Sequence, residues 1–123
     1  MKILFILFGL FELAAASQFL TADTAAVAAR FGIQDFPPAG LMFLGMFGVA
    51  ITAIGLMSFF AIRVTDPRGL FYLCLGFALY NIGSAVYLLA VPGFVGTARM
   101  PIVVHSIFFL AFLWPLARFR RAG

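Results

Sequence analysis

Four runs of mostly apolar residues, each long enough to cross a lipid bilayer, occupy most of this 123-residue chain. They cover about residues 3–20, 39–62, 69–91 and 101–116, and a start one turn earlier is the alternative for the fourth run. A membrane-spanning helix needs about 20 predominantly apolar residues. All four runs are apolar on every side, which is typical of helices surrounded by lipid or by other helices. The sequence therefore predicts an all-α integral membrane bundle of four transmembrane helices, forming a single domain over residues 1–123.

The composition excludes several other classes of protein. Hydrophobic residues make up 65% of the chain and charged residues only 10%, whereas a soluble domain carries about 25% charged residues. A soluble enzyme, an extended nucleic-acid binder and a disordered tail are therefore excluded. The net charge of +4 does not indicate nucleic acid, because the basic residues lie at the ends of the apolar runs. The partner that these positions favour is the bilayer itself.

Proline, glycine and aspartate mark the limits of the runs. Pro38 falls at the start of the second run, and Asp66 before Pro67 offers a side-chain cap to the third. Pro92 and Gly93 end the third run. In the loop between the first two runs, residues 23–31 read as one short outer helix lying at the membrane surface.

The first run allows two interpretations. Lys2, an apolar core and the small residues Ala14–Ala16 resemble a secretory signal with its cleavage site. Glu12 interrupts that core. We expect a retained transmembrane helix.

The distribution of basic residues predicts the orientation of the chain. Short cytoplasmic loops carry an excess of Lys and Arg. Six basic residues fall on one predicted side and two on the other, namely Lys2, Arg63, Arg68, Arg118, Arg120 and Arg121 against Arg30 and Arg99. We expect a multi-pass protein of the bacterial inner membrane, with both termini in the cytoplasm.

Small residues recur at helical spacing in two of the runs. Because lipid is as apolar as leucine, membrane helices associate where small residues let their backbones approach. The first stripe is Gly45, Gly48, Thr52 and Gly55, and the second is Gly69, Tyr72, Gly76, Tyr80, Gly83 and Tyr87. We expect both stripes to face the bundle interior as packing surfaces, with a tyrosine-lined ligand slot as the alternative for the second.

Polar side chains at membrane depth are expensive and face the interior or a partner. At about 1.5 Å per helical residue, Glu12 falls near the middle of its helix, and Asn81 and His105 fall at neighbouring depths. We predict a polar cluster formed by these three residues, with Tyr80, Ser84, Ser106 and Gln18 near it. Glu12 is either a proton-coupling carboxyl or a structural hydrogen-bond donor between helices, and a contact with another subunit is the third alternative.

Other chemistry has little support. One histidine cannot ligate a haem from both sides within the chain. The single cysteine, Cys74, rules out an intrachain disulfide, and no metal-ligand spacing is present. We expect no bound cofactor and no enzyme activity. Contact with a pigment held by a partner, with a quinone or with a lipid stays open.

The end of the fourth run carries an aromatic and basic group. Trp114, Arg118, Arg120 and Arg121 lie within eight residues. Tryptophan and arginine at the end of an apolar run are typical of interface anchors. Binding of anionic lipid headgroups is the alternative.

Two family resemblances follow from these features. The long outer loop, the turn Arg63–Arg68 (RVTDPR) and the Asn81-Ile82-Gly83 motif resemble small bacterial four-helix membrane proteins of the DoxX-like type. That resemblance implies a fold more than an activity. The chain is also similar to small multidrug-resistance exporters in length and in the mid-helix Glu12, and this similarity implies proton exchange against aromatic cations. The only tryptophan here, Trp114, lies in the fourth run and not in the third.

The sequence thus favours a non-catalytic accessory or packing subunit that docks on a larger membrane complex. Self-association is the other form of partnership that we expect. The alternative function is a proton-coupled carrier, or a binder of a small hydrophobic ligand, that uses Glu12.

Overall fold

The structure is a computed structural model that describes residues 1–21, 26, 38–90 and 99–121. Within these ranges the chain forms four helices and no strand. The helices are α1 (Lys2–Thr21), α3 (Pro38–Ala61), α4 (Pro67–Ala90) and α6 (Arg99–Arg121). All four are long and apolar enough to cross a membrane. The predicted fold class, an all-α multi-pass membrane protein with four helices, is therefore confirmed.

The predicted helix limits hold closely for three of the four helices. The ends of α1, α3 and α4 fall within two residues of the expected positions. Helix α6 begins at Arg99, two residues before the expected start, but it differs at its end, because it runs to Arg121, five residues beyond the expected Leu116. The predicted outer helix 23–31 lies outside the described residues except for Ala26, which is helical and exposed.

The start of α4 shows how the sequence sets a helix end. The Asp66 carboxylate accepts a hydrogen bond of 2.6 Å from the backbone N–H of Gly69. The Asp66 carbonyl accepts a second bond of 3.0 Å from the N–H of Leu70. Pro67 takes the first helical position, where its missing N–H costs nothing. Asp66 is thus the N-cap of α4, as the sequence predicts.

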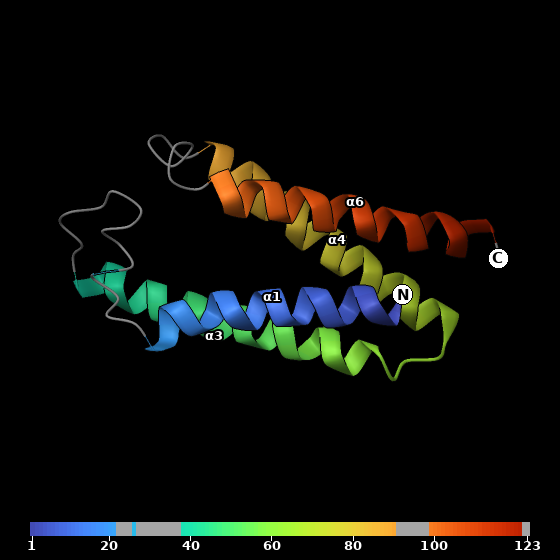
Figure 1. Cartoon of the computed structure of the whole chain (residues 1–123), viewed down its shortest axis with the longest axis horizontal. Helices are drawn as coiled ribbons and strands as arrows, with labels where there is room; N and C mark the ends of the chain where they lie inside the picture. The colour runs from blue at the N-terminus through green and yellow to red at the C-terminus, as the bar shows by residue number, and fades with distance from the viewer. Residues whose placement is uncertain (22–25, 27–37, 91–98, 122–123) are drawn as a thin grey trace. The chain divides into compact units, whose positions relative to one another are not determined.

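The helices associate as two antiparallel pairs (Figure 1). Lys2–Ile62 form one compact unit, in which α1 packs on α3. Arg63–Gly123, with Met1, form the other, in which α4 packs on α6. All tryptophan, tyrosine, cysteine and histidine residues of the chain belong to the second pair. The expectation that residues 1–123 form one domain stays a prediction.

Helix α6 continues through a proline. Pro115 lies inside the helix and is buried. Proline cannot donate the backbone hydrogen bond to the carbonyl four residues earlier, here that of Ala111. Membrane helices tolerate such a residue because neighbouring groups satisfy the freed carbonyl. The helix therefore carries its basic residues Arg118, Arg120 and Arg121 as a continuous extension of the apolar segment.

Candidate functional site

Helices α1 and α3 approach closely where Gly9 of α1 meets Gly55 of α3. A methyl group added at Gly9 would lie 3.1 Å from the Gly55 carbonyl oxygen and 2.8 Å from the ring of Phe59. The reverse substitution at Gly55 would put a methyl group 3.3 Å from the Gly9 carbonyl oxygen and 3.0 Å from Leu13. The two backbones approach because neither position carries a side chain. This is the small-residue packing that replaces the hydrophobic effect in lipid.

Ser58 joins the same two helices by a hydrogen bond. Its hydroxyl lies 3.0 Å from the Phe5 carbonyl of α1 and 3.0 Å from the Gly55 carbonyl of its own helix. A hydroxyl has one hydrogen, so the two carbonyls share one donor. Ser58 is fully buried. The bond therefore links α1 to α3 one turn away from the Gly9–Gly55 contact.

Two of the four residues of the predicted α3 stripe face α1, and the expected position of the whole stripe in the bundle interior stays a prediction. Gly48 and Gly55 face α1, and a methyl group at Gly48 would lie 2.9 Å from the Cβ of Phe19. Gly45 has nothing within 4 Å of an added methyl group, and the Thr52 hydroxyl bonds back to the Gly48 carbonyl at 2.8 Å. The buried face instead continues through Ile51 and Ser58. Ile51, three residues after Gly48, is buried. Gly45, three residues before Gly48, faces away from α1.

Asn81 and His105 connect α4 to α6. The Oδ1 atom of Asn81 lies 2.9 Å from Nδ1 of His105, and the Asn81 Nδ2 atom donates to the Phe77 carbonyl at 2.8 Å. Asn81 is fully buried and His105 is 8% exposed. Closer to the start of α4, the rings of Phe77 and Phe112 pack with centroids 5.4 Å apart. A polar link and an aromatic contact thus hold the two helices together.

The hydrogen-bond network determines the tautomer of His105. A backbone carbonyl only accepts, so the amide nitrogen of Asn81 must face Phe77. The amide oxygen therefore faces His105, and an oxygen of this kind accepts too. Nδ1 of His105 must then carry the hydrogen and donate it to Asn81. In the neutral ring the other nitrogen, Nε2, is consequently the acceptor.

The residues expected near this link have different surroundings. The Tyr80 ring meets the His105 ring edge to face, with centroids 5.6 Å apart. Ser84 is partly buried on α4. The Ser106 hydroxyl bonds to the Ile102 carbonyl of its own helix at 2.8 Å. Gln18 is exposed on α1.

Glu12 belongs to the other pair. It is 1% exposed and is the eleventh residue of the 20-residue helix α1, one turn after Gly9. At about 1.5 Å per residue this is roughly 15 Å from the helix start, which is half of a hydrocarbon core about 30 Å thick. Its expected proximity to Asn81 and His105 stays a prediction.

Most of the predicted stripe on α4 does not contact α6, and its expected position in the bundle interior stays a prediction. Tyr72 and Tyr87 are 68% and 69% exposed, and an added methyl group at Gly76 or Gly83 would meet nothing within 4 Å. Gly69 contacts the capping residue Asp66 instead. The buried residues of α4 are Leu70, Cys74, Phe77, Ala78, Asn81 and Ala85. We call the exposed surface of Tyr72, Gly76, Gly83 and Tyr87 the open α4 face.

The two exposed tyrosines also have a simple explanation. Tyr72 is the sixth residue of the 24-residue helix α4, and Tyr87 is the fourth from its end. Tyrosine is enriched at both membrane boundaries, where the ring is apolar and the hydroxyl reaches water. This placement argues against a tyrosine-lined slot, since Tyr80 is the only tyrosine that turns toward α6. It leaves Gly76 and Gly83 as the central part of the open α4 face.

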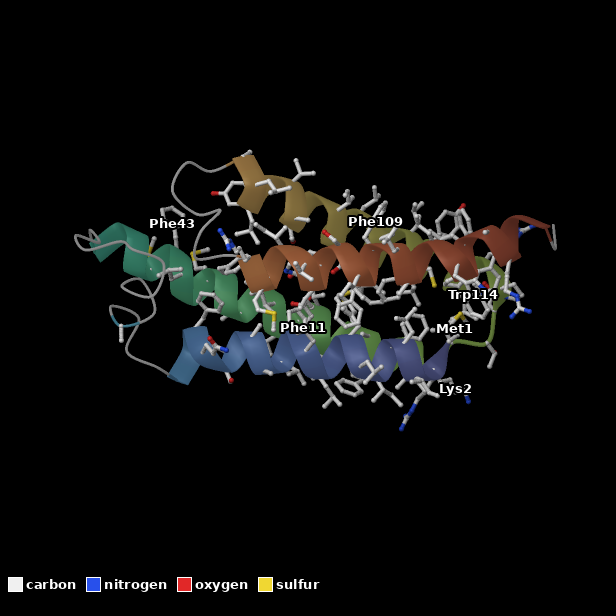
Figure 2. All side chains as sticks on the ribbon, turned by 45° about the horizontal axis from the view of Figure 1, so that its top comes forward. Met1, Lys2, Phe11, Phe43, Phe109 and Trp114 are labelled. Atoms are coloured by element: carbon white, nitrogen blue, oxygen red, sulfur yellow. The ribbon has the colours of Figure 1, made fainter. Side chains whose placement is uncertain are left out.

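The expected interface anchors lie at the C-terminal end of α6 (Figure 2). The guanidinium carbon of Arg118 is 4.7 Å from the centroid of the Trp114 ring. Both side chains are exposed. Arg120 and Arg121 are the last two residues of the same helix. The sequence spacing of four residues brings the indole and the guanidinium onto one side of α6.

Groups that could hold a metal are sparse in the described part of the chain. No three residues of the His, Cys, Asp and Glu types gather there. Cys74 is buried on α4 as a free cysteine, as expected from its apolar surroundings in the sequence. His105 is buried and its Nδ1–H is directed to Asn81, and contact with a partner's pigment stays a prediction.

Two residues that matter most for packing were not identified from the sequence. Gly9 is the only glycine of α1, and it lies three residues before Glu12. Ser58 follows Gly55 by three residues on α3. The available signal was this spacing, since a small residue one turn from a polar or small residue is a common helix-packing pattern in membranes.

Comparison with protein-family models, with curated proteins and with solved structures found no match for this chain.

Proposed function

We propose that this chain is a non-catalytic membrane subunit that docks on a larger membrane protein assembly through the open α4 face. The observation that carries the proposal is the contrast between two sets of glycines. Gly9, Gly48 and Gly55 each meet a neighbouring helix, whereas Gly76 and Gly83 have open space around them.

The physical reason is the absence of a hydrophobic driving force within lipid. A glycine in a helix interior costs about 1 kcal/mol relative to alanine, and in membranes it is useful where a second backbone approaches. Gly76 and Gly83 are seven residues apart, two helical turns on one side of α4. A partner helix of the same chemistry, apolar with small residues at the contact, fits this surface.

The test is extraction of native membranes with a mild detergent, followed by size separation, mass spectrometry and an absorption spectrum. We expect the chain to travel with a larger complex, and the double variant Gly76→Leu/Gly83→Leu to leave that complex. Gly45→Leu is the matched control, because Gly45 also has open space but lies on α3. A chain that runs alone, or only as a small homo-oligomer, contradicts the proposal.

A second candidate function rests on Glu12. A carboxyl buried midway along an apolar helix is costly and is retained in membranes for ion or proton movement. We therefore keep a proton-coupled carrier of a hydrophobic ligand as the alternative. It predicts a pH-dependent carboxyl band in the infrared spectrum that disappears in Glu12→Gln. It also predicts that cells with Glu12→Gln grow less well in toxic cations than cells with the unchanged chain.

The control for this experiment is Ser17→Ala, which changes another polar residue of α1. The Ser17 hydroxyl bonds to the Ala14 carbonyl of its own helix at 2.8 Å. The carrier is contradicted if Glu12→Gln cells grow normally in toxic cations and the wild-type spectrum has no band that depends on pH.

A further inference from the structure

We propose that the end of the α4–α6 pair that carries Trp114 and Arg118 is a binding site for the phosphate group of an anionic phospholipid. This inference is independent of the proposed docking function. It rests on the spacing of the arginines along α6, on the contact between Arg118 and Trp114, and on the charge at this end of the pair.

The spacing places Arg118 at a membrane boundary. Arg99 and Arg118 are nineteen residues apart in one continuous helix, or about 28 Å at 1.5 Å per residue. The hydrocarbon core of a bilayer is about 30 Å thick. When one arginine lies at each boundary, Trp114 is one turn inside the boundary next to Arg118. Arg118 itself is then level with lipid headgroups.

The contact between the two side chains gives the guanidinium a defined position. Its carbon lies 4.7 Å from the centroid of the indole ring, within the range of a cation–π interaction. Stacking uses the face of the guanidinium, whereas its N–H donors point outward in the plane. Arg118 can therefore stack on Trp114 and donate two hydrogen bonds to a phosphate at the same time.

The charge at this end favours an anion. Helices α4 and α6 are antiparallel, so the start of α4 and the end of α6 lie at the same end of the pair (Figure 1). Five arginines belong to this end, and they are Arg63, Arg68, Arg118, Arg120 and Arg121. The only acidic residue in residues 63–123 is Asp66, whose carboxylate accepts the Gly69 N–H. The opposite end carries only Arg99.

A lipid fits these features better than a soluble anion. The indole of Trp114 is 57% exposed and lies beside the apolar part of α6, where an acyl chain covers it. The phosphate of the same molecule then reaches Arg118. Basic residues next to a membrane helix attract anionic headgroups in this way, by a factor on the order of five per side chain.

The single tryptophan makes the test selective. The full chain is reconstituted in vesicles of phosphatidylcholine that contain either brominated phosphatidylglycerol or brominated phosphatidylcholine. Bromine quenches tryptophan fluorescence on contact, and Trp114 is the only tryptophan, so quenching measures which lipid lies at this site. We expect brominated phosphatidylglycerol to quench severalfold more effectively, and Arg118→Gln to lower this preference about fivefold.

Two matched variants separate a site from a general attraction. Arg99→Gln removes a charge from the other end of α6 and should leave the preference unchanged. Arg63→Gln removes an exposed charge from the same end but not from the Trp114 contact, and should lower the preference less than Arg118→Gln does. Each variant is compared with its own fluorescence without bromine, since Arg118→Gln also alters the surroundings of the indole.

Three results would overturn the proposal. The first is equal quenching by the two brominated lipids, and the second is an equal loss of preference in Arg63→Gln and Arg118→Gln. The third is displacement of brominated phosphatidylglycerol by millimolar inorganic phosphate at constant ionic strength, which would assign the site to a soluble anion. Preserved quenching in phosphate, with a larger loss of preference in Arg118→Gln than in Arg63→Gln, supports a lipid site.

Discussion

At the scale of single residues, the same amino acid has opposite roles at different places in this chain. Gly9 lies where two helix backbones meet, and its missing side chain is what permits the contact. Gly45 and Gly76 have open space around them. Only a glycine at a helix contact, such as Gly9, is required for packing within a pair. Its replacement should therefore lower the stability of the pair, and replacement of Gly45 or Gly76 should not.

We predict that Gly9→Ala destabilises the α1–α3 pair whereas Gly76→Ala does not destabilise its own pair. The new methyl group at Gly9 lies 2.8 Å from the Phe59 ring and 3.1 Å from the Gly55 carbonyl, and overpacking of this kind costs about 1–3 kcal/mol. At Gly76 the new methyl group meets no neighbour, so the only effect that we expect is a gain in helix propensity of up to about 1 kcal/mol. Helix content followed by circular dichroism during denaturation in detergent measures both. Equal stability of the two variants would contradict this prediction.

Ser58→Ala should partly restore the stability of Gly9→Ala. The Ser58 hydroxyl is the atom closest to the methyl group that Gly9→Ala introduces, and its hydrogen bond to Phe5 keeps it there. Removing the hydroxyl relieves that contact, at the cost of a membrane hydrogen bond of about 0.6 kcal/mol. The double variant should therefore be more stable than the sum of the two single changes. Thr52→Ala, whose hydroxyl bonds within its own helix, is the control and should give additive effects.

At the scale of helices, most ends were predictable and the packing faces within each pair were not. Asp66 and Pro67 marked the start of α4 because capping and proline effects are local. The end of α6 was missed because loss of hydropathy at Arg118 ends an apolar run without ending a helix. Packing faces depend on the neighbouring helix, and helices that are apolar all round carry no amphipathic signal. Asn81 indicated the buried side of α4 better than its glycines did, because an amide at that depth needs a partner.

The link between Asn81 and His105 predicts a coupling between α4 and α6. Asn81→Leu removes the acceptor of the His105 Nδ1–H and leaves a buried donor, which should cost about 1–2 kcal/mol. His105→Leu in the same chain removes that donor, so the double variant should recover part of the loss. A double-mutant cycle, measured by unfolding in detergent, should give a coupling of about 0.6–1.7 kcal/mol.

Ser106→Ala is the comparison for this cycle, because its hydroxyl bonds to its own helix. It should change stability by less than about 0.5 kcal/mol. A coupling of zero between Asn81 and His105 would mean that the bond adds nothing to the pair. Nitrogen chemical shifts of His105 that place the hydrogen on Nε2 would contradict the tautomer derived from the network.

At the scale of the whole molecule, the positions of the basic residues predict topology. Four crossings, one for each helix, would return the chain to its starting side, so we expect both ends in one compartment. We predict that a fluorescent protein fused after Gly123 is fluorescent in bacterial cells, and that alkaline phosphatase fused there is inactive. Fusions after Arg99 should give the opposite result, with active alkaline phosphatase and a fluorescent protein that does not fluoresce. Active phosphatase at Gly123 would place both ends outside.

The candidate site could be predicted in part from the sequence. Polar residues in an apolar chain are few, so Glu12, Asn81 and His105 could be selected from the sequence. Which of them meet is decided by helix rotation and pairing. The hydrogen bond between Asn81 and His105 lies within one pair, whereas Glu12 lies in the other.

The division of the chain into two pairs also divides its optical signals. Every residue that fluoresces usefully, or that absorbs strongly in the near ultraviolet, lies in residues 63–123, and residues 1–62 contain only phenylalanine among the aromatic types. Intrinsic fluorescence therefore reports on α4 and α6 and is blind to α1 and α3. A melting curve recorded from Trp114 contains no emission from the residues around the Gly9–Gly55 contact. Phe47→Trp, at a half-exposed ring that meets Phe19 edge to face, would make the silent half visible.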